Sequence, residues 1–135
     1  MQFIQWLYNW GNLITGTLPT ELGMMLNLKD FYFAEELVDG TIPTELGLLS
    51  GIQTLELSEN LLSGTIPTEL SLIGWEVIHS TPFLHLDNNN LNGTIPFLGN
   101  LSKISLYSND LTGTFPIEYA SWETECEFDL LACLF

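Results

Sequence analysis

The chain is very poor in basic residues. It has 135 residues with no arginine and two lysines, Lys29 and Lys103, against seventeen acidic residues, which gives a formal net charge of −15. Phosphate groups are recognised through lysine and arginine, and a strongly acidic protein is repelled by nucleic acid and by anionic membrane surfaces. The composition therefore excludes nucleic acid as a partner and predicts that most of the acids form a solvated surface.

Cysteines and long apolar runs are also scarce. The two cysteines, Cys126 and Cys133, cannot complete a zinc site, and an extended segment between them would hold the sulfurs about 20 Å apart, too far for a disulfide. No apolar stretch approaches the ~18 residues of a transmembrane helix, and segment 1–8 lacks the basic start of a signal peptide. We therefore expect no metal site, no cofactor and no membrane insertion by this segment.

What the chain has in abundance is a repeated tetrapeptide. Five copies of Gly-Thr-x-Pro start at positions 16, 40, 64, 93 and 113, so the steps between them are 24, 24, 29 and 20 residues. A period of this length is typical of a solenoid, in which one structural unit is stacked on itself. Such a protein builds no enclosed catalytic cavity by default. The repeats predict a single array over residues 1–135.

The third copy shows the unit most clearly. Leu55 and Leu57 alternate with polar residues, which is typical of a short strand with one buried face. Asn60 follows where the chain turns, and its amide can bond the backbone of its own turn and of the neighbouring coil. Gly64 allows the backbone angles that a bend needs. Pro67 has no N–H, so neither a strand ladder nor a helix can continue through its nitrogen.

The other copies align with this unit by number. The predicted inward strand pairs are Leu7/Asn9, Phe31/Phe33, Leu55/Leu57, Leu84/Leu86 and Ile104/Leu106. The turn column, a predicted structural ladder, reads Asn12, Glu36, Asn60, Asn89 and Asn109. We expect Glu36 to interrupt the ladder, because an ionised carboxylate cannot donate a hydrogen bond. Asn9 is a second departure, because it puts an amide where the other coils bury an apolar residue.

The coils differ in length. The fourth is five residues longer than the third, and segment 71–83, with Trp75 and Pro82, must hold the insertion. The fifth is four residues shorter, so we expect a bare loop in place of a helical turn after Pro96. A shift of 24 residues carries Ile104 onto Phe128, so the tail predicts a sixth strand.

The consensus L-x-x-L-x-L-x-x-N-x-L-x-G-x-I-P-x-x-L-x-x-L resembles leucine-rich repeats of the plant-specific type. That type occurs in receptor-like kinase ectodomains, receptor-like proteins and polygalacturonase-inhibiting proteins. The segment Gly-Thr-Ile-Pro-Thr-Glu-Leu-Gly is also similar to the repeats of diatom repeat proteins. The resemblance covers residues 4–135, and Cys133 fits a column where the family accepts asparagine or cysteine.

The resemblance implies an α/β solenoid. Its expected parts are a right-handed superhelix, a parallel concave sheet of about six short strands, a second smaller sheet near Gly-x-Ile-Pro, and short helical or irregular convex segments. It also implies an extracellular or cell-surface location and partner binding on the concave sheet. The sequence has no paired-cysteine cap, kinase domain or membrane anchor. We therefore expect a fragment, or a chain whose uncapped ends associate.

Outward positions on the strands form the candidate binding surface. Aromatic residues on a rigid face bury a large area at little entropic cost, which interfaces favour. Alternatively, these side chains only cover their neighbours along the sheet. The candidate contact residues are Trp6, Tyr8, Trp10, Tyr32, Glu56, His85, Asp87 and Tyr107.

Two repeated columns are weaker candidates. The threonine row consists of Thr17, Thr41, Thr65, Thr94 and Thr114. Such a row could match ice or a polysaccharide, although threonine is also an ordinary water-facing strand residue. The column of Glu21, Glu45 and Glu69 lacks the clustered oxygen ligands of a calcium loop and predicts a solvated edge.

No residue set points to catalysis. His79, His85 and Asp87 occur without an activated serine or cysteine, so we expect the chain not to be an enzyme. Asn92 and Asn100 head glycosylation sequons, which matter if the chain is secreted.

The sequence therefore predicts a recognition or scaffold module that binds a protein or peptide ligand, or a glycan, on the concave sheet of a receptor-like or secreted protein. Two alternatives stay open. One is a surface-adsorbing protein that uses the threonine row on ice or cell-wall glycan. The other is a purely structural spacer.

Overall fold

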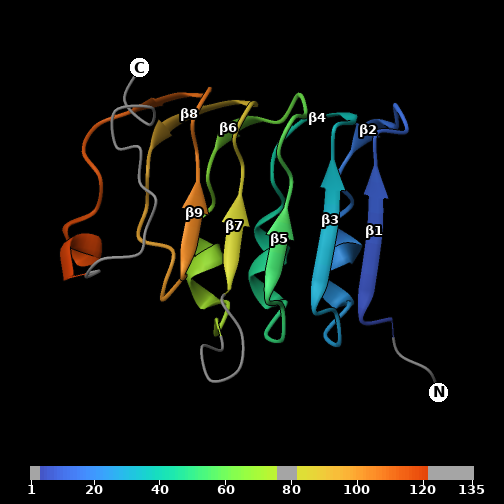
Figure 1. Ribbon diagram of the computed structural model, residues 1–135, viewed down its shortest axis with the longest axis horizontal. Helices are drawn as coiled ribbons and strands as arrows, with labels where there is room; N and C mark the ends of the chain where they lie inside the picture. Colours follow the sequence, from blue (N-terminus) through green and yellow to red (C-terminus); the bar gives the residue numbers. More distant parts are fainter. Residues whose placement is uncertain (1–3, 76–81, 122–135) are drawn as a thin grey trace.

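Residues 4–75 and 82–121 are described by a computed structural model, and they form a solenoid of stacked coils (Figure 1). One strand per coil joins a parallel five-stranded sheet in the order β1-β3-β5-β7-β9. These strands are β1 (Trp6–Trp10), β3 (Asp30–Ala34), β5 (Thr54–Glu56), β7 (Phe83–His85) and β9 (Lys103–Ser105). The solenoid fold is confirmed, while the expected sixth strand, both cysteines and His79 lie outside the described residues.

The register of this sheet follows the sequence repeat without slippage. Leu7 lies opposite Phe31, Phe31 opposite Leu55, Leu55 opposite Leu84, and Leu84 opposite Ile104. The last four are buried, and Leu7 packs against the same core. Because side chains alternate across a strand, the residues between these apolar positions face outward together. We call this outward surface of the five strands the strand face.

A second set of strands follows each turn. It comprises a pair, β2 (Thr15–Thr17) with β4 (Leu37–Asp39), and a three-stranded sheet ordered β10-β8-β6. The three are β6 (Ser63–Thr65), β8 (Asn90–Thr94) and β10 (Asp110–Thr112), and an isolated bridge joins Thr41 to Ser63. The smaller sheet that the family resemblance implied is thus present in two linked parts.

The register of the second set is shifted by two residues relative to the sequence repeat. Thr17 lies opposite Asp39, and Thr65 lies opposite Asn92, so threonine never faces the threonine of its own column. Two residues along a strand cover about 6.6 Å and adjacent strands are about 4.8 Å apart, so successive threonines of the row are about 8 Å apart. The threonine row is therefore oblique and not a directly stacked ladder.

Short 3₁₀ helices lie behind the large sheet, except the last, which lies beyond β9 (Figure 1). They are η1 (Thr20–Met24), η2 (Thr44–Leu48), η3 (Thr68–Leu72) and η4 (Ile117–Ser121). The first three begin directly after Pro19, Pro43 and Pro67, whose fixed backbone angle suits the position before a helix. Residues 97–102 contain no helix, which confirms the loop predicted for the shortened coil.

The long fourth coil supports this loop. Trp75, at the end of its described part, is buried, and its indole N–H donates to the carbonyl of Leu98 at 2.8 Å. The amide of Leu98 donates to the hydroxyl oxygen of Tyr119 at 2.7 Å. Leu98 is completely buried, and a helical turn would otherwise satisfy its backbone groups. Insertion and deletion in adjacent coils therefore compensate each other.

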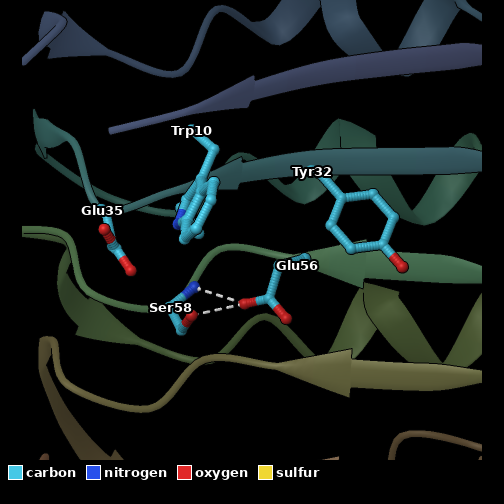
Figure 2. Close-up of a pocket in the computed structure, with 6 residues that line it drawn as sticks. Trp10, Tyr32, Glu35, Glu56 and Ser58 are labelled. Atoms are coloured by element: carbon cyan, nitrogen blue, oxygen red, sulfur yellow. Dashed lines mark hydrogen bonds between the residues drawn. The ribbon is translucent and has the colours of Figure 1, made fainter. Parts of the chain in front are cut away.

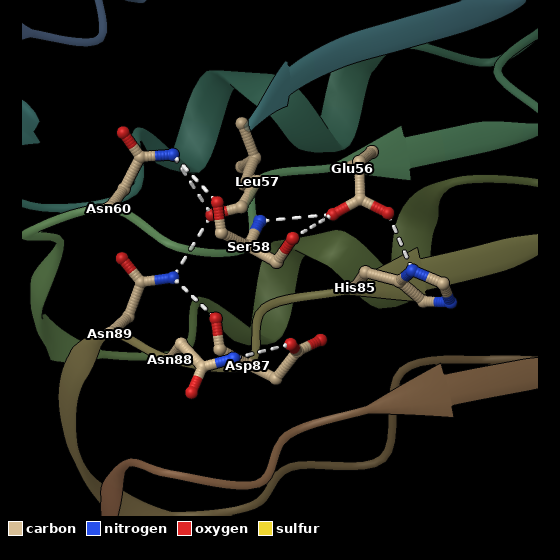
Figure 3. Close-up of polar contacts among 8 residues, drawn as sticks. All are labelled: Glu56, Leu57, Ser58, Asn60, His85, Asp87, Asn88 and Asn89. Carbon is tan, nitrogen blue, oxygen red and sulfur yellow. Dashed lines mark hydrogen bonds and ion pairs between the residues drawn. The ribbon is translucent and has the colours of Figure 1, made fainter. Parts of the chain in front are cut away.

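An amide ladder joins the coils at their turns (Figure 3). The Asn89 amide nitrogen donates to the carbonyls of Leu57, Leu86 and Asp87 at 3.0 to 3.2 Å, and its oxygen accepts the N–H of Leu62 at 3.0 Å. Asn60 and Asn109 repeat this arrangement in their own coils. Each amide thus satisfies backbone groups of two successive coils.

The expectation that Glu36 interrupts this ladder is only partly correct. Its buried carboxylate accepts the amide of Ile14 at 2.7 Å, which is the bond that Asn60 makes with Val38. It also accepts the N–H of Asn12 at 2.9 Å and the side-chain amide of Asn9 at 2.6 Å. Glu36 therefore keeps the accepting role of the ladder residue and lacks only the donating role. Between these two coils the side-chain hydrogen bond runs the other way, from Asn9 to Glu36. The two departures from the repeat are therefore partners.

We predict that the acceptor role of Glu36 can be separated from its charge. Glu36→Ala leaves three donors without their acceptor and should lower the free energy of unfolding by about 2 kcal/mol. Glu36→Asn restores the residue that accepts the equivalent N–H in other coils and should cost clearly less. Urea unfolding followed by circular dichroism measures both. Equal losses in the two variants would contradict this account.

Candidate binding surface

Aromatic side chains dominate the strand face near its first strand. Trp6, Tyr8 and Trp10 on β1 are 58%, 60% and 68% exposed, and Tyr107 beyond β9 is 42% exposed. Tyr32 lies beside Tyr8 and is half-buried. The structure thus places the predicted aromatic residues on one surface, with most of them at one end.

The rings in the middle of this surface touch one another. Tyr8 and Tyr32 have ring centroids 4.9 Å apart, Tyr32 and Phe83 are 6.5 Å apart edge to face, and Phe83 and His85 are 4.9 Å apart. These separations lie in the range of favourable aromatic pairs. Tyr32 is therefore held between two neighbours. Phe83 lies in the outward column predicted to begin with Trp6, but it was not among the predicted contact residues.

A pocket of about 330 Å³ opens where β1, β3 and β5 end (Figure 2). Its lining residues are Trp10, Tyr32, Ala34, Glu35, Glu56 and Ser58. Ala34 and Ser58 occupy the same outward column as the large Trp10 and Tyr107, and their small side chains leave the space empty. The pocket is a consequence of two small residues in a column that is bulky at both ends.

Glu56 is held in place on both sides (Figure 3). Its Oε1 accepts the backbone N–H of Ser58 at 3.1 Å and the Ser58 hydroxyl at 2.5 Å, while Oε2 lies 2.5 Å from His85 Nδ1. Burial opposes ionisation of this carboxyl, but the hydrogen bonds from His85 and Ser58 outweigh burial and lower the pKa of Glu56. The pocket therefore contains an oriented, ionised carboxylate.

Two predicted contact residues are less accessible than expected. Glu56 and Asp87 lie on the strand face, but their exposed fractions are only 9% and 6%. Asp87 accepts the side-chain amide of Asn88 at 3.0 Å, and its hydrogen bond with Tyr107 raises the pKa of that phenol. Both carboxylates therefore act mainly on their neighbours, and of the two only Glu56 lines the pocket and can be reached by a ligand there.

The polar cluster does not have the order of a hydrolase triad. In a triad the histidine lies between nucleophile and acid, so that it can take the nucleophile's proton. Here the carboxylate of Glu56 lies between Ser58 and His85. Within residues 4–75 and 82–121, no group of three metal-ligating side chains occurs.

The remaining candidates lie on other surfaces. All five threonines of the row are exposed, as are the sequon residues Asn92 and Asn100. The carboxylates of the glutamate column accept hydrogen bonds from the preceding threonine hydroxyls at 3.3 to 3.4 Å. The sequence reading missed an exposed apolar row at the ends of η1, η2 and η3, although its spacing of 24 residues was readable. This row consists of Met24, Leu48 and Leu72.

Comparison with known proteins identifies the repeat. A family model described as Leucine Rich Repeat matches residues 51–73. A search of curated protein sequences gives no match. In the described part of the chain, no helix is long and apolar enough to cross a membrane.

Solved structures share the fold over most of the chain. PEPR1 in complex with AtPEP1 is 31% identical over 93% of this chain, with a TM-score of 0.79. The ectodomain of the Arabidopsis thaliana receptor kinase GASSHO1/SCHENGEN3, in complex with CASPARIAN STRIP INTEGRITY FACTOR 2, is 36% identical over 77%, with a TM-score of 0.69. A plant ice-binding protein is 30% identical over 87%, with a TM-score of 0.77. The chain spans only 17%, 12% and 38% of these three chains.

The pKa of Glu56 leads to a prediction for stability against pH. Because the folded-state pKa is lowered, ionised Glu56 stabilises the fold above its unfolded pKa of about 4.3, and this is lost as pH falls through the folded value. Glu56→Gln should therefore cost about 1 kcal/mol near pH 7, and the cost should shrink between about pH 5 and pH 3.

The matched control is Glu45→Gln on the helix side, where the carboxylate accepts one threonine hydroxyl. Its effect in urea unfolding should be small at every pH. If the free energy of unfolding differed between wild type and Glu56→Gln by the same amount at every pH down to about 3, the charge of Glu56 would not stabilise the fold.

Proposed function

Because the chain is built of leucine-rich repeats of the plant-specific type, we propose that it is a recognition module that binds a protein or peptide ligand on the strand face. The observation that carries this proposal is the combination of exposed Trp6, Tyr8 and Trp10 with the adjoining pocket. Large aromatic side chains beside a concave site are the usual anchors of an interface.

The rigidity of this surface supports the same function. Backbone hydrogen bonds join the strands of the large sheet to one another. The amide ladder fixes successive coils at the turns that follow these strands. A partner therefore meets side chains that are already ordered, and binding loses less entropy than it would on a loop. Two of the similar structures carry AtPEP1 and CASPARIAN STRIP INTEGRITY FACTOR 2, which makes a peptide or small protein the natural first ligand class to test here.

A place outside the cell, in a receptor-like or secreted protein, belongs to this proposal. The similarity to the ectodomain of the membrane receptor kinase GASSHO1/SCHENGEN3 supports it. Exposed Asn92 and Asn100 are then available for glycosylation, since neither side chain is buried by a neighbouring coil.

A second candidate function uses the other sheet. The likeness to a plant ice-binding protein and the exposed threonine row favour adsorption to ice. The methyls of Thr17, Thr41, Thr65 and Thr94 pack close to the glycine of the next coil, where a side-chain Cβ would lie only 2.9 to 3.3 Å from the methyl carbon. This contact limits threonine rotation and makes the row regular, although the shifted register spaces its members widely.

The peptide proposal predicts a strand-face dependence of binding. Peptides selected from a displayed random library against the whole chain should lose about tenfold or more in affinity when Tyr32 or Tyr107 is replaced by alanine. Glu45→Ala and Glu69→Ala, on the helix side, should leave affinity unchanged. If only the helix-side variants weakened binding, the strand face would not be the site.

The ice proposal predicts thermal hysteresis in a nanolitre osmometer. The double variant Thr41→Leu/Thr65→Leu should remove most of it, because it replaces two exposed hydroxyls in the row. Thr44→Leu/Thr68→Leu changes two exposed threonines outside the row and should have no effect. Absence of hysteresis in the wild-type chain, or equal loss in both variants, would refute adsorption through the row.

A further inference from the structure

The pocket at the ends of β1, β3 and β5 combines aromatic walls with a fixed carboxylate. We propose that it binds the guanidinium group of an arginine side chain in the peptide ligand. This inference rests on the proposed function, since the arginine belongs to a peptide on the strand face. It adds the chemical class of the residue that the site selects.

The shape of the pocket suits a long side chain that enters from the strand face. The small residues Ala34 and Ser58 are among its lining residues. Trp10 and Tyr32 stand on either side of it (Figure 2). Its volume of about 330 Å³ exceeds that of any single amino-acid side chain. An arginine can therefore enter without displacing a wall residue.

The aromatic walls favour a planar cation. Trp10 is 68% exposed, so its indole is free to be covered by a ligand. Tyr32 is held between Tyr8 and Phe83, so its ring needs no further ordering. A guanidinium stacks on such rings through both its charge and its flat face, whereas the ammonium of lysine offers only a point charge.

The carboxylates supply the charge complementarity. Glu56 has about four lone-pair positions, of which Ser58 and His85 occupy three, so Oε2 can accept one more donor. Glu35 at the pocket edge is exposed, and no residue in the described ranges hydrogen-bonds its carboxylate. The ligand would thus find one oriented acceptor and one that can turn to meet it.

The chain itself offers no cation of this kind. It contains no arginine. Lys29 directly precedes β3 and Lys103 begins β9, so both lie at the amino ends of their strands, whereas the pocket lies at the carboxyl ends of β1, β3 and β5. Within the described residues, neither lysine forms an ion pair with Glu35 or Glu56, and His85 is the only group paired with Glu56. The negative potential of the pocket therefore favours a cationic guest over a neutral or anionic one.

The direct test uses a small probe on the whole chain. Nα-acetyl-arginine methylamide is titrated while the backbone amide signal of Ser58 is followed by ¹⁵N NMR, with Nα-acetyl-citrulline methylamide as the neutral isostere. The arginine probe should bind about tenfold or more tightly than the citrulline probe, the expected worth of one cation–π contact and one ionic hydrogen bond. Equal binding of the two probes would overturn the proposal.

Variants locate the effect. Ala34→Leu fills the pocket and Trp10→Ala removes an exposed wall, and each should abolish the shift caused by the arginine probe. Glu56→Gln should weaken it about tenfold. Ser105→Leu on the same face and Glu45→Gln on the helix side are the matched controls and should bind like wild type. Amide dispersion reports folding, and because Trp10 is exposed, its variant keeps the test valid if Ala34→Leu unfolds.

The peptide selection separates this inference from the proposed function. Selected peptides that contain arginine and lose affinity in Ala34→Leu support both. Peptides that lose affinity in Tyr107→Ala but contain no essential arginine and tolerate Ala34→Leu overturn the inference and leave the proposed function standing. Selection of no strand-face binder overturns the proposed function, whereas the small-probe titration still decides whether the pocket recognises a guanidinium.

Discussion

The need to satisfy backbone groups where each coil turns governs this structure. The chain bends there inside a buried layer, so its carbonyl and N–H groups cannot all reach water. Asn60, Asn89 and Asn109 meet this need with one side chain per coil, which bonds two successive coils. Because the same contact recurs at each of these turns, the large sheet keeps one register, and its outward columns become fixed surfaces.

The one position where a carboxylate replaces the amide lies beside the candidate binding site. Asn9 sits between Tyr8 and Trp10, and Glu36 directly follows the pocket residue Glu35. Their 2.6 Å hydrogen bond joins the first two coils at the two positions that depart from the repeat. Glu35 itself has a φ of 54°, a left-handed value shared by Glu59 and Asn88 in equivalent turns. The turn geometry thus survives the exchange of the ladder residue, and the pocket edge keeps its position.

The sequence predicted the strand columns because a period of fixed length also fixes which residues lie side by side. It predicted the missing helix after Pro96 because the coil is too short to form one. It could not predict that Trp75 and Tyr119 hydrogen-bond the backbone carbonyl and N–H of Leu98, because this depends on how far side chains extend between three successive coils. The pocket was also missed, although small Ala34 and Ser58 in a bulky column were a readable signal. Asn9 and Glu36 were noticed singly, and their facing positions in adjacent coils could have identified them as a pair.

The large sheet and the second set of strands present different kinds of surface because their registers differ. In the large sheet, sequence-equivalent residues lie side by side, so side chains such as Tyr8, Tyr32 and Glu56 touch and build a local pocket. In the second set, equivalent residues are offset by two positions, so successive threonines of the row are not paired with one another. The first geometry favours a ligand with distinct side chains, and the second favours only an extended, repetitive surface. The aromatic residues and the oriented carboxylate all lie on the first, which is why peptide recognition accounts for more of the structure than adsorption does.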